Sequence, residues 1–386
     1  MSNTPQICAL GLAAASLLPV PLTAQDVPAT RLDRPAATFA EPMSQIRGLR
    51  ELTDGRVVVT DMIETAVRLI DFRSGAMQEI GRQGDGPGEY GMPGELFAAG
   101  GDTTLMLDML NRRFLVIPPT GAIADETMPI ARGGGGGVSY ITLPRGVDDR
   151  GRIYFDLSGI VAPGVDFALR GESPILRLDP AANRTDTIAT MQFPPMPAPR
   201  SSGRGQNVTV RFGGGPRPYQ GRDTWAVARD GRVAIVRHAD YRVEWHRAGE
   251  APVVGPPTQY APVRVGRAEK EAWADRMTQG TMVMVQNGQR RTMQPPKPNI
   301  DEQEWPEYLP PFVGNARITP EGELWIQRSR PASATRELYD VFDGQGRLVR
   351  QVELAEGRRL VGFGRSVLYA IQTDEDDLQW LERYRR

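Results

Sequence analysis

The chain has 386 residues, 40% of them hydrophobic, and its formal net charge at pH 7 is −1. This balance excludes a general electrostatic attraction to nucleic acid or to an anionic membrane surface. Its 42 glycines and 33 prolines show no collagen-like period and therefore indicate many turns. The length would allow two or three ordinary domains, but an all-β fold often uses this many residues in one.

The N-terminal segment has the pattern of a secretory signal. Residues 7–20 are nearly all apolar, and Leu22-Thr23-Ala24 precedes a candidate cleavage point before Gln25. A run of about 14 residues is too short to cross a bilayer as a helix. No Lys or Arg precedes Arg31, which is atypical of a signal, and a buried β-strand is the alternative. We predict a signal peptide over residues 1–24, an N-terminal linker over 25–36, and a periplasmic or secreted protein.

The only cysteine, Cys8, lies inside this predicted signal peptide. The mature chain would then contain no cysteine, which excludes disulfides, thiol catalysis and cysteine metal sites.

A short phrase recurs six times along the chain, in which a glycine is followed by a run of strand-forming apolar residues. The glycines are Gly55, Gly101, Gly151, Gly231, Gly322 and Gly364. A second candidate strand follows each run, as at 67–72 and 241–245. The shorter spacings between the glycines, 46, 50 and 42 residues, match one four-stranded propeller blade. The two longer spacings leave room for a blade and an insertion.

We therefore predict an all-β fold, a six-bladed β-propeller of four-stranded antiparallel blades over residues 37–386. Blades cannot bury their faces alone and must stack in a ring. The last blade is short at its C-terminal end, so the segment 37–46 is expected to supply its outer strand and close the ring.

Three insertions interrupt the predicted blades, at 131–147, 194–222 and 255–311. The third contains one helical pattern near 266–279, where Ala268, Ala272 and Trp273 share a face. This helix would lie either across one mouth of the ring or on its rim.

Several segments resemble NHL-type repeats and the exported bacterial six-bladed β-propeller proteins. The similar segments are Gly81–Tyr90, Trp225–Ala234, Tyr241–Trp245, Trp305–Phe312 and Gly322–Trp325. The resemblance runs over most of residues 42–386 and implies the fold, because most members of the exported group have no assigned activity. The glycines at 81–88 could suggest a phosphate loop, but the Lys-Ser/Thr of such a loop is missing, so we predict an inter-blade turn.

The candidate ligand-binding residues are the polar residues at the ends of the recurring strands. They are Asp61, Asp108, Asp156, His238 and Gln327. Equivalent positions in neighbouring blades are expected to converge on one mouth of the channel. Three carboxylates there could hold Ca²⁺, a cation that prefers oxygen ligands, or could bind a polar ligand. The alternative is that each Asp caps its own turn by accepting backbone N–H bonds.

The sequence offers no catalytic motif. His238 and His246 are the only histidines, which argues against a histidine zinc site, and no Gly-x-Ser-x-Gly elbow occurs. Trp225, Trp245, Trp325 and Trp380 fall in or beside predicted strands and are expected in the core.

Two functions are consistent with these patterns. The first is a non-catalytic cell-envelope or secreted scaffold, a monomer that binds a small polar ligand, glycan or peptide at the propeller mouth and needs no cofactor. The alternative is a Ca²⁺-dependent hydrolase similar to the six-bladed gluconolactonase-like group, in which a channel cation activates water. The Glu, Asn and Asp metal ligands of that group cannot be placed on this sequence.

Overall fold

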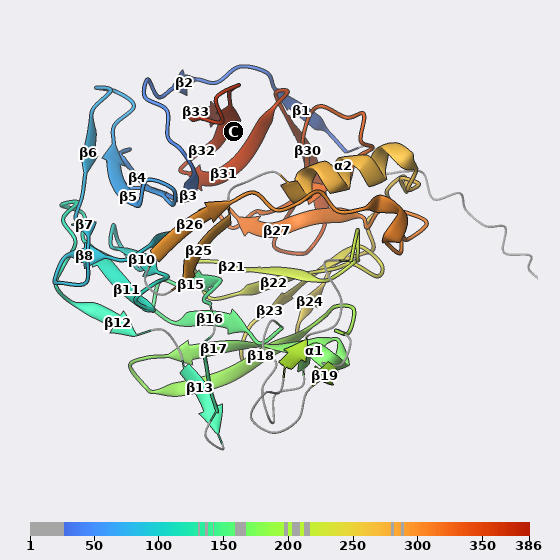
Figure 1. Ribbon diagram of the computed structural model, residues 1–386, viewed down its shortest axis with the longest axis horizontal. Helices are drawn as coiled ribbons and strands as arrows, with labels where there is room; N and C mark the ends of the chain where they lie inside the picture. The colour runs from blue at the N-terminus through green and yellow to red at the C-terminus, as the bar shows by residue number, and fades with distance from the viewer. Residues whose placement is uncertain are drawn as a thin grey trace, which may run out of the picture.

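The computed structural model describes residues 27–129, 132–135, 138–141, 143–158, 167–196, 200–202, 209–211, 217–278, 282–286 and 289–386. The predicted signal peptide, residues 1–24, and parts of the three predicted insertions lie outside these residues. Six sheets radiate from a common axis, and Figure 1 views the molecule approximately along it.

Each of the six sheets is a blade of four antiparallel strands, which confirms the predicted fold. Blade 1 contains β3 (Ile46–Glu51), β4 (Val57–Asp61), β5 (Ala66–Ile70) and β6 (Met77–Glu79). Blade 2 contains β9 (Pro93–Ala98), β10 (Thr104–Asp108), β11 (Arg113–Ile117) and β12 (Thr127–Pro129). Blade 3 contains β15 (Gly146–Val147), β16 (Ile153–Asp156), β17 (Glu172–Asp179) and β18 (Arg184–Gln192).

The other three blades follow the same order of strands. Blade 4 contains β21 (Thr224–Val227), β22 (Val233–Arg237), β23 (Arg242–His246) and β24 (Val253–Val254). Blade 5 contains β27 (Phe312–Ile318), β28 (Leu324–Arg328), β29 (Leu338–Phe342) and β30 (Leu348–Leu354). Blade 6 contains β31 (Arg358–Gly364), β32 (Val367–Thr373), β33 (Gln379–Arg385) and β2 (Ala37–Thr38).

The N-terminal strand β2 closes the ring, as predicted. It pairs antiparallel with β33, with Ala37 opposite Arg383, and Met43 forms a further bridge with Gln379. Phe39 and Met43 are buried in the core between the last blade and the first. This arrangement covers the edge that the C-terminal strand would otherwise expose.

The residues that we assigned to a linker, 25–36, contain a strand. β1 (Ala29–Leu32) pairs parallel with β30 and adds a fifth strand to blade 5. Three of its four residues are exposed, so the strand is held by its backbone pairing with β30 and not by the burial of alternating apolar side chains. The sequence therefore carries no alternating pattern from which this strand could be predicted.

Six of the seven core clusters in the described part of the chain each fill the seam between two neighbouring blades. The seventh, Phe155 and Leu157, packs within blade 3. The second strand of each blade supplies much of this packing, and all residues of β4 and β10 are buried. Trp225, Trp245 and Trp325 are buried in these seams, as the sequence predicts. Trp380, also predicted in the core, is only partly buried, and its indole donates to the Asp374 carboxylate at 2.7 Å. The apolar run after each recurring glycine is therefore the part of a blade that two neighbours bury.

Short elements connect or decorate the blades. The connection between blades 1 and 2 contains β7 (Arg82–Gln83) and β8 (Glu89–Tyr90), in the expected inter-blade turn. The insertions contribute three hairpins and three helical segments. They are β13 (Arg132–Gly135), β14 (Val138–Ile141), α1 (Phe167–Arg170), β19 (Arg200–Ser202), β20 (Thr209–Arg211), α2 (Arg267–Thr278), β25 (Met282–Gln286), β26 (Gln289–Met293) and η1 (Ile300–Glu302).

The predicted helix near 266–279 is α2, and it packs against segments next to blades 4 and 5. Trp273 packs edge-on against Trp305, with 5.4 Å between the ring centroids. The Tyr219 hydroxyl donates to the Glu269 carbonyl at 2.6 Å, and the Ala332 amide donates to the Glu269 carboxylate at 3.1 Å. Figure 1 shows α2 beside β27 and β30.

Candidate functional site

The strand order places every long insertion at one mouth of the propeller. The innermost strands are β3, β9, β15, β21, β27 and β31, which contact one another around the axis. Segments 130–145, 159–171, 193–223 and 255–311 all connect strands at the edge where these innermost strands begin. We call this edge the insertion mouth, and the opposite edge, where short turns such as 52–56 and 228–232 lie, the turn mouth.

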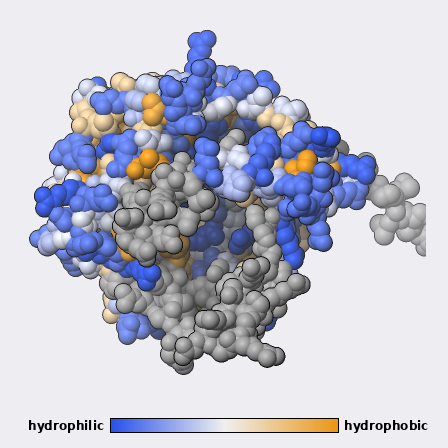
Figure 2. Space-filling model, in the orientation of Figure 1, coloured by the Kyte–Doolittle hydropathy of each residue, from blue (hydrophilic) through white to orange (hydrophobic). Residues whose placement is uncertain are grey.

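Two cavities lie along the axis and share a common waist. The first, which we call the insertion chamber, has a volume of about 510 Å³ and contains Asp156 and Trp225 in its lining. The second, the bore, has a volume of about 460 Å³ and is lined by residues of all six innermost strands. Both are lined by Glu95, Phe97, Arg145, Ala316 and Arg317, which form the waist. Figure 2 shows a hollow near the centre of this face, whose described surface is mostly hydrophilic.

Arginine dominates the charge of the insertion chamber. Its lining includes Arg47, Arg145, Arg222 and Arg317, but only two carboxylates, Glu95 and Asp156. Counted as formal charges, this lining carries an excess of positive charge. Such an excess attracts an anion and disfavours a divalent cation.

Two of the four arginines have a carboxylate neighbour. Arg47 lies 3.3 Å from Glu95, and both side chains are partly exposed. Arg145 lies 3.6 Å from Asp156, donates to the Asn315 side chain at 2.7 Å, and stacks 5.3 Å above the Trp225 ring. These contacts fix Arg145 in place.

The other two arginines have no carboxylate partner among the residues that the structure describes. Arg317 donates to the Val361 carbonyl at 3.2 Å. Arg222 donates to the Ser158 hydroxyl at 3.5 Å and stacks on Phe193. Both guanidinium groups therefore line the chamber with a charge that no carboxylate in the described chain neutralises.

Arg359 of blade 6 does not line the chamber, but it lies close enough to Arg317 and Arg47 for their charges to affect it. Burial lowers the pKa of Arg359, and the nearby charges of Arg317 and Arg47 lower it further, although Glu337 acts in the opposite direction. Burial likewise lowers the pKa of Arg145, and Arg222 adds to this effect against Asp156. Like charges that lower one another's pKa in this way repel, and a bound anion would relieve the repulsion.

The structure places the five predicted ligand residues in different surroundings. Asp61 is buried, and its carboxylate accepts bonds from the Ser44, Gln45, Ile63 and Glu64 amides, at 2.7–3.1 Å. Asp108 is also buried and accepts bonds from the Gly91, Met92 and Asn111 amides. These two carboxylates cap the strand ends, the alternative raised above.

Asp156 is the predicted residue that lines the insertion chamber. It accepts a bond from the Ser158 amide at 2.9 Å and another from the Trp225 indole at 3.0 Å. Gln327 lies on β28 and is partly buried beside Gly314. Neither Gln327 nor His238 is among the residues that line the two cavities. The prediction that all five bind one ligand remains a prediction.

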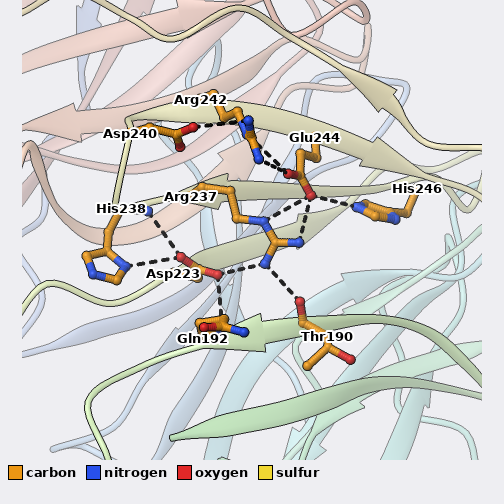
Figure 3. Close-up of polar contacts among 9 residues, drawn as sticks. All are labelled: Thr190, Gln192, Asp223, Arg237, His238, Asp240, Arg242, Glu244 and His246. Atoms are coloured by element: carbon orange, nitrogen blue, oxygen red, sulfur yellow. Dashed lines mark hydrogen bonds and ion pairs between the residues drawn. The ribbon is translucent and has the colours of Figure 1, made fainter.

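Both histidines belong to a network of charged groups in blade 4 (Figure 3). The His238 imidazole Nδ1 lies 3.2 Å from Asp223, and the Arg237 guanidinium bridges Asp223 and Glu244 at 2.8 and 2.7 Å. His246 Nε2 lies 3.2 Å from Glu244 on the other side.

Both carboxylates of this network titrate below their ordinary range. Burial raises the pKa of Asp223, but the bonds it accepts from His238 and Arg237 outweigh burial and lower it overall. Glu244 follows the same pattern, because Arg237 and His246 outweigh burial and lower its pKa overall. The network holds β22, β23 and the start of β21 together.

No group of three or more His, Cys, Asp or Glu side chains within the described part of the chain could hold a metal ion. The three aspartates suggested for Ca²⁺ therefore do not form such a group. In the same part of the chain, no helix is long and apolar enough to cross a membrane.

Sequence reasoning missed the arginines of the chamber. Arg47 and Arg317 lie on innermost strands, and these strands carry no recurring glycine phrase. An available signal was the charge of the insertions, since residues 194–222 contain five arginines and no acidic residue.

Comparison with known proteins finds similar solved structures but no family. No protein-family model and no curated protein matches the chain. Solved structures that match over most of their length include a member of the DUF4221 family from Bacteroides vulgatus, at 8% identity, with a TM-score of 0.49 and 91% and 95% of the two chains covered.

Two similar enzymes have lower TM-scores. A gluconolactonase from Xanthomonas campestris has 11% identity, a TM-score of 0.40 and coverage of 90% and 92%. Virginiamycin B lyase from Staphylococcus aureus has 11% identity, a TM-score of 0.39 and coverage of 90% and 98%. The sheets of the chain itself define the six-bladed β-propeller, and the gluconolactonase and the virginiamycin lyase are similar to it only at low sequence identity.

Proposed function

We propose that this protein is an exported, monomeric, non-catalytic binding protein for a small anionic ligand, which it holds in the insertion chamber. The observation that carries the proposal is the excess of arginine over carboxylate in the lining, four against two. The apolar segment at residues 7–20 supports export. The ligand is a more specific form of the small polar ligand expected from the sequence.

The geometry of the arginines favours an anion with oxygen atoms. Arg317 uses Nη1 for the Val361 carbonyl, and a guanidinium has five N–H donors in a planar fork. A carboxylate or phosphate accepts two such donors at once, which adds both strength and orientation. A site of about 510 Å³ lies within the roughly 300–1,000 Å³ that is usual for small-molecule sites.

The sequence of the insertions adds positive charge near the same mouth. The predicted insertion 131–147 contains two arginines and no Asp or Glu, and 194–222 contains five arginines and none. Both segments connect to strand ends at the insertion mouth. Charge of one sign around a cavity raises the local concentration of the opposite ion and its rate of entry.

The proposal is tested by isothermal titration calorimetry of the full chain with phosphate, succinate and benzoate, and with the neutral analogues succinamide and benzamide. We expect at least one anion to bind and its neutral analogue to bind at least tenfold more weakly. Added salt should weaken binding of the anion, because salt screens its attraction to the arginines.

Two arginine variants locate the site. Arg317→Gln should weaken binding of the anion at least tenfold. Arg73→Gln is the control, because the Arg73 side chain is 73% exposed on an outer turn of blade 1, and this variant should bind the anion as the wild type does. Absence of binding by every anion, or equal losses in the two variants, would refute the proposal.

A further inference from the structure

We propose that the ligand of the insertion chamber is an amphipathic organic acid, with one carboxylate and an aliphatic or aromatic body. This inference rests on the proposed function and makes it more specific. The observation behind it is an apolar surface in the chamber lining, on blades 2 and 3, that lies opposite Arg317 of blade 5.

The apolar side comes from blades 2 and 3. Phe97 and Met109 come from blade 2, and Leu143 and Pro144 lie immediately before the first strand of blade 3. Phe97 is fixed by an edge-on contact with Phe114, with 5.9 Å between the ring centroids. The lining therefore offers a preformed apolar surface, which an inorganic anion would leave unused.

Leu143 is the exposed member of this apolar surface. Its exposed fraction is 55%, among the highest of the large hydrophobic side chains in the described chain. A leucine that lines a cavity and remains this exposed gains free energy when a ligand covers it, since burial of apolar surface is favourable. Its place in the lining identifies it as part of the ligand surface.

Arg317 lies across the axis from this apolar surface, because blade 2 is opposite blade 5 in a ring of six blades. It belongs to β27 of blade 5 and lines the chamber. Within the described chain no carboxylate lies within ion-pair distance of Arg317, and its guanidinium donates to the Val361 carbonyl. The other three lining arginines lie on blade 1 and next to blades 3 and 4.

A ligand that uses both features has its carboxylate on Arg317 and its body on the apolar surface of blades 2 and 3. Arg145 is already held by Asn315 and Trp225. A compact dianion would use the arginines alone. The lining therefore favours a monocarboxylate with an apolar body over phosphate or a short dicarboxylate.

The test is a titration of the full chain with butanoate, hexanoate and octanoate. Each methylene that becomes buried should tighten binding about fourfold, so each two-carbon step should tighten it by about an order of magnitude. Octan-1-ol, which lacks the carboxylate, should bind at least tenfold more weakly than octanoate.

A matched pair of leucine variants assigns the effect to the chamber. Leu143→Ser should weaken binding of octanoate several-fold and leave binding of butanoate unchanged. Leu110→Ser is the control, because Leu110 is 44% exposed but does not line the chamber. Both side chains are exposed, so neither substitution is expected to prevent folding.

The outcomes separate this inference from the proposed function. If butanoate and octanoate bind equally, or if Leu143→Ser keeps the full dependence on chain length, the amphipathic ligand is refuted, while an effect of Arg317→Gln preserves anion binding. If no acid in either panel binds, both proposals are refuted.

Discussion

The Tyr369 hydroxyl in the last blade donates a hydrogen bond of 2.5 Å to the Glu51 carboxylate in the first blade. The Arg365 amide donates to the same carboxylate at 2.8 Å. Residues that are more than three hundred positions apart in the chain are thus joined beside the innermost strands. Together with β2, this contact closes the ring, and burial and Glu51 together raise the pKa of Tyr369, which therefore remains a donor at physiological pH.

Loss of this contact should loosen the seam between the first and last blades. Tyr369→Phe removes the donor and should lower the free energy of unfolding by about 1–3 kcal/mol, because a partly buried carboxylate loses one partner. Hydrogen exchange should become faster in both blade 1 and blade 6.

Tyr384→Phe is the matched control for this seam. It removes a similar bond of 2.6 Å to Glu382, but both residues lie on β33. Because Tyr384 packs in the seam between blades 5 and 6, faster exchange should then be confined to these two blades. If the two variants have the same exchange pattern, the Tyr369–Glu51 contact does not contribute to closure.

The two buried aspartates should affect stability and leave ligand binding unchanged. Asp61→Asn replaces an acceptor of four backbone amides and should cost about 1–3 kcal/mol in urea denaturation. Asp108→Asn should act similarly.

Asp156→Asn should have the opposite profile, with a smaller effect on stability and a larger one on binding. It removes one of the two negative charges from the chamber, so an anion such as benzoate should bind more tightly. Weaker binding of benzoate by Asp61→Asn than by the wild type, in folded protein, would instead favour the predicted aspartate cluster.

The sequence predicts the fold well and the site poorly, for a physical reason. The second strand of each blade is buried in an inter-blade seam, so Val57–Asp61 and its equivalents must be apolar and are visible as a repeat. β2 was predictable because the last blade lacked a strand. β1 is held by backbone pairing and leaves no such pattern.

The candidate site depends on which blades face one another, and this is a property of the closed ring. Arg317 and Phe97 are 220 positions apart in the numbering but line the same waist. Neither has an individual sequence signal. The aspartates did have one, but their shared position reflects a shared turn, in which each of the three carboxylates accepts a bond from a backbone amide a few residues later.

The two N-terminal strands should differ greatly in their contribution to stability. Removal of residues up to 34 deletes β1 and the exposed ion pairs of Arg31 and Asp33, and it should cost at most about 2 kcal/mol. Removal up to 44 also deletes β2, Phe39 and Met43, and loss of Phe39 alone should cost about 3–5 kcal/mol.

Thermal unfolding of the two truncated chains measures this difference. The chain that begins at residue 35 should unfold in one cooperative transition close to that of the full chain. The chain that begins at residue 45 should be strongly destabilised or should aggregate through its exposed edge at β33. Equal stability of the two would contradict closure of the ring by β2.

The charged network of blade 4 should make the fold sensitive to acid. The folded pKa values of Asp223 and Glu244 lie below their ordinary values, which are about 3.9 and 4.3. The ionised forms therefore stabilise the fold above these ordinary values, and this contribution is lost as pH falls through the lower folded values. Urea denaturation at pH 6, 5, 4 and 3 should show a progressive loss of unfolding free energy below about pH 5.

Asp223→Asn tests the source of this acid sensitivity. It should lower stability at pH 6, because Arg237 and His238 lose a carboxylate partner that is almost fully buried, and it should flatten the decline between pH 5 and 3. Asp240→Asn is the control, since Asp240 is 39% exposed and pairs with Arg242 at the surface. That variant should change stability by less than about 1 kcal/mol and keep the wild-type pH profile. An unchanged decline in Asp223→Asn would place the acid sensitivity elsewhere in the ring.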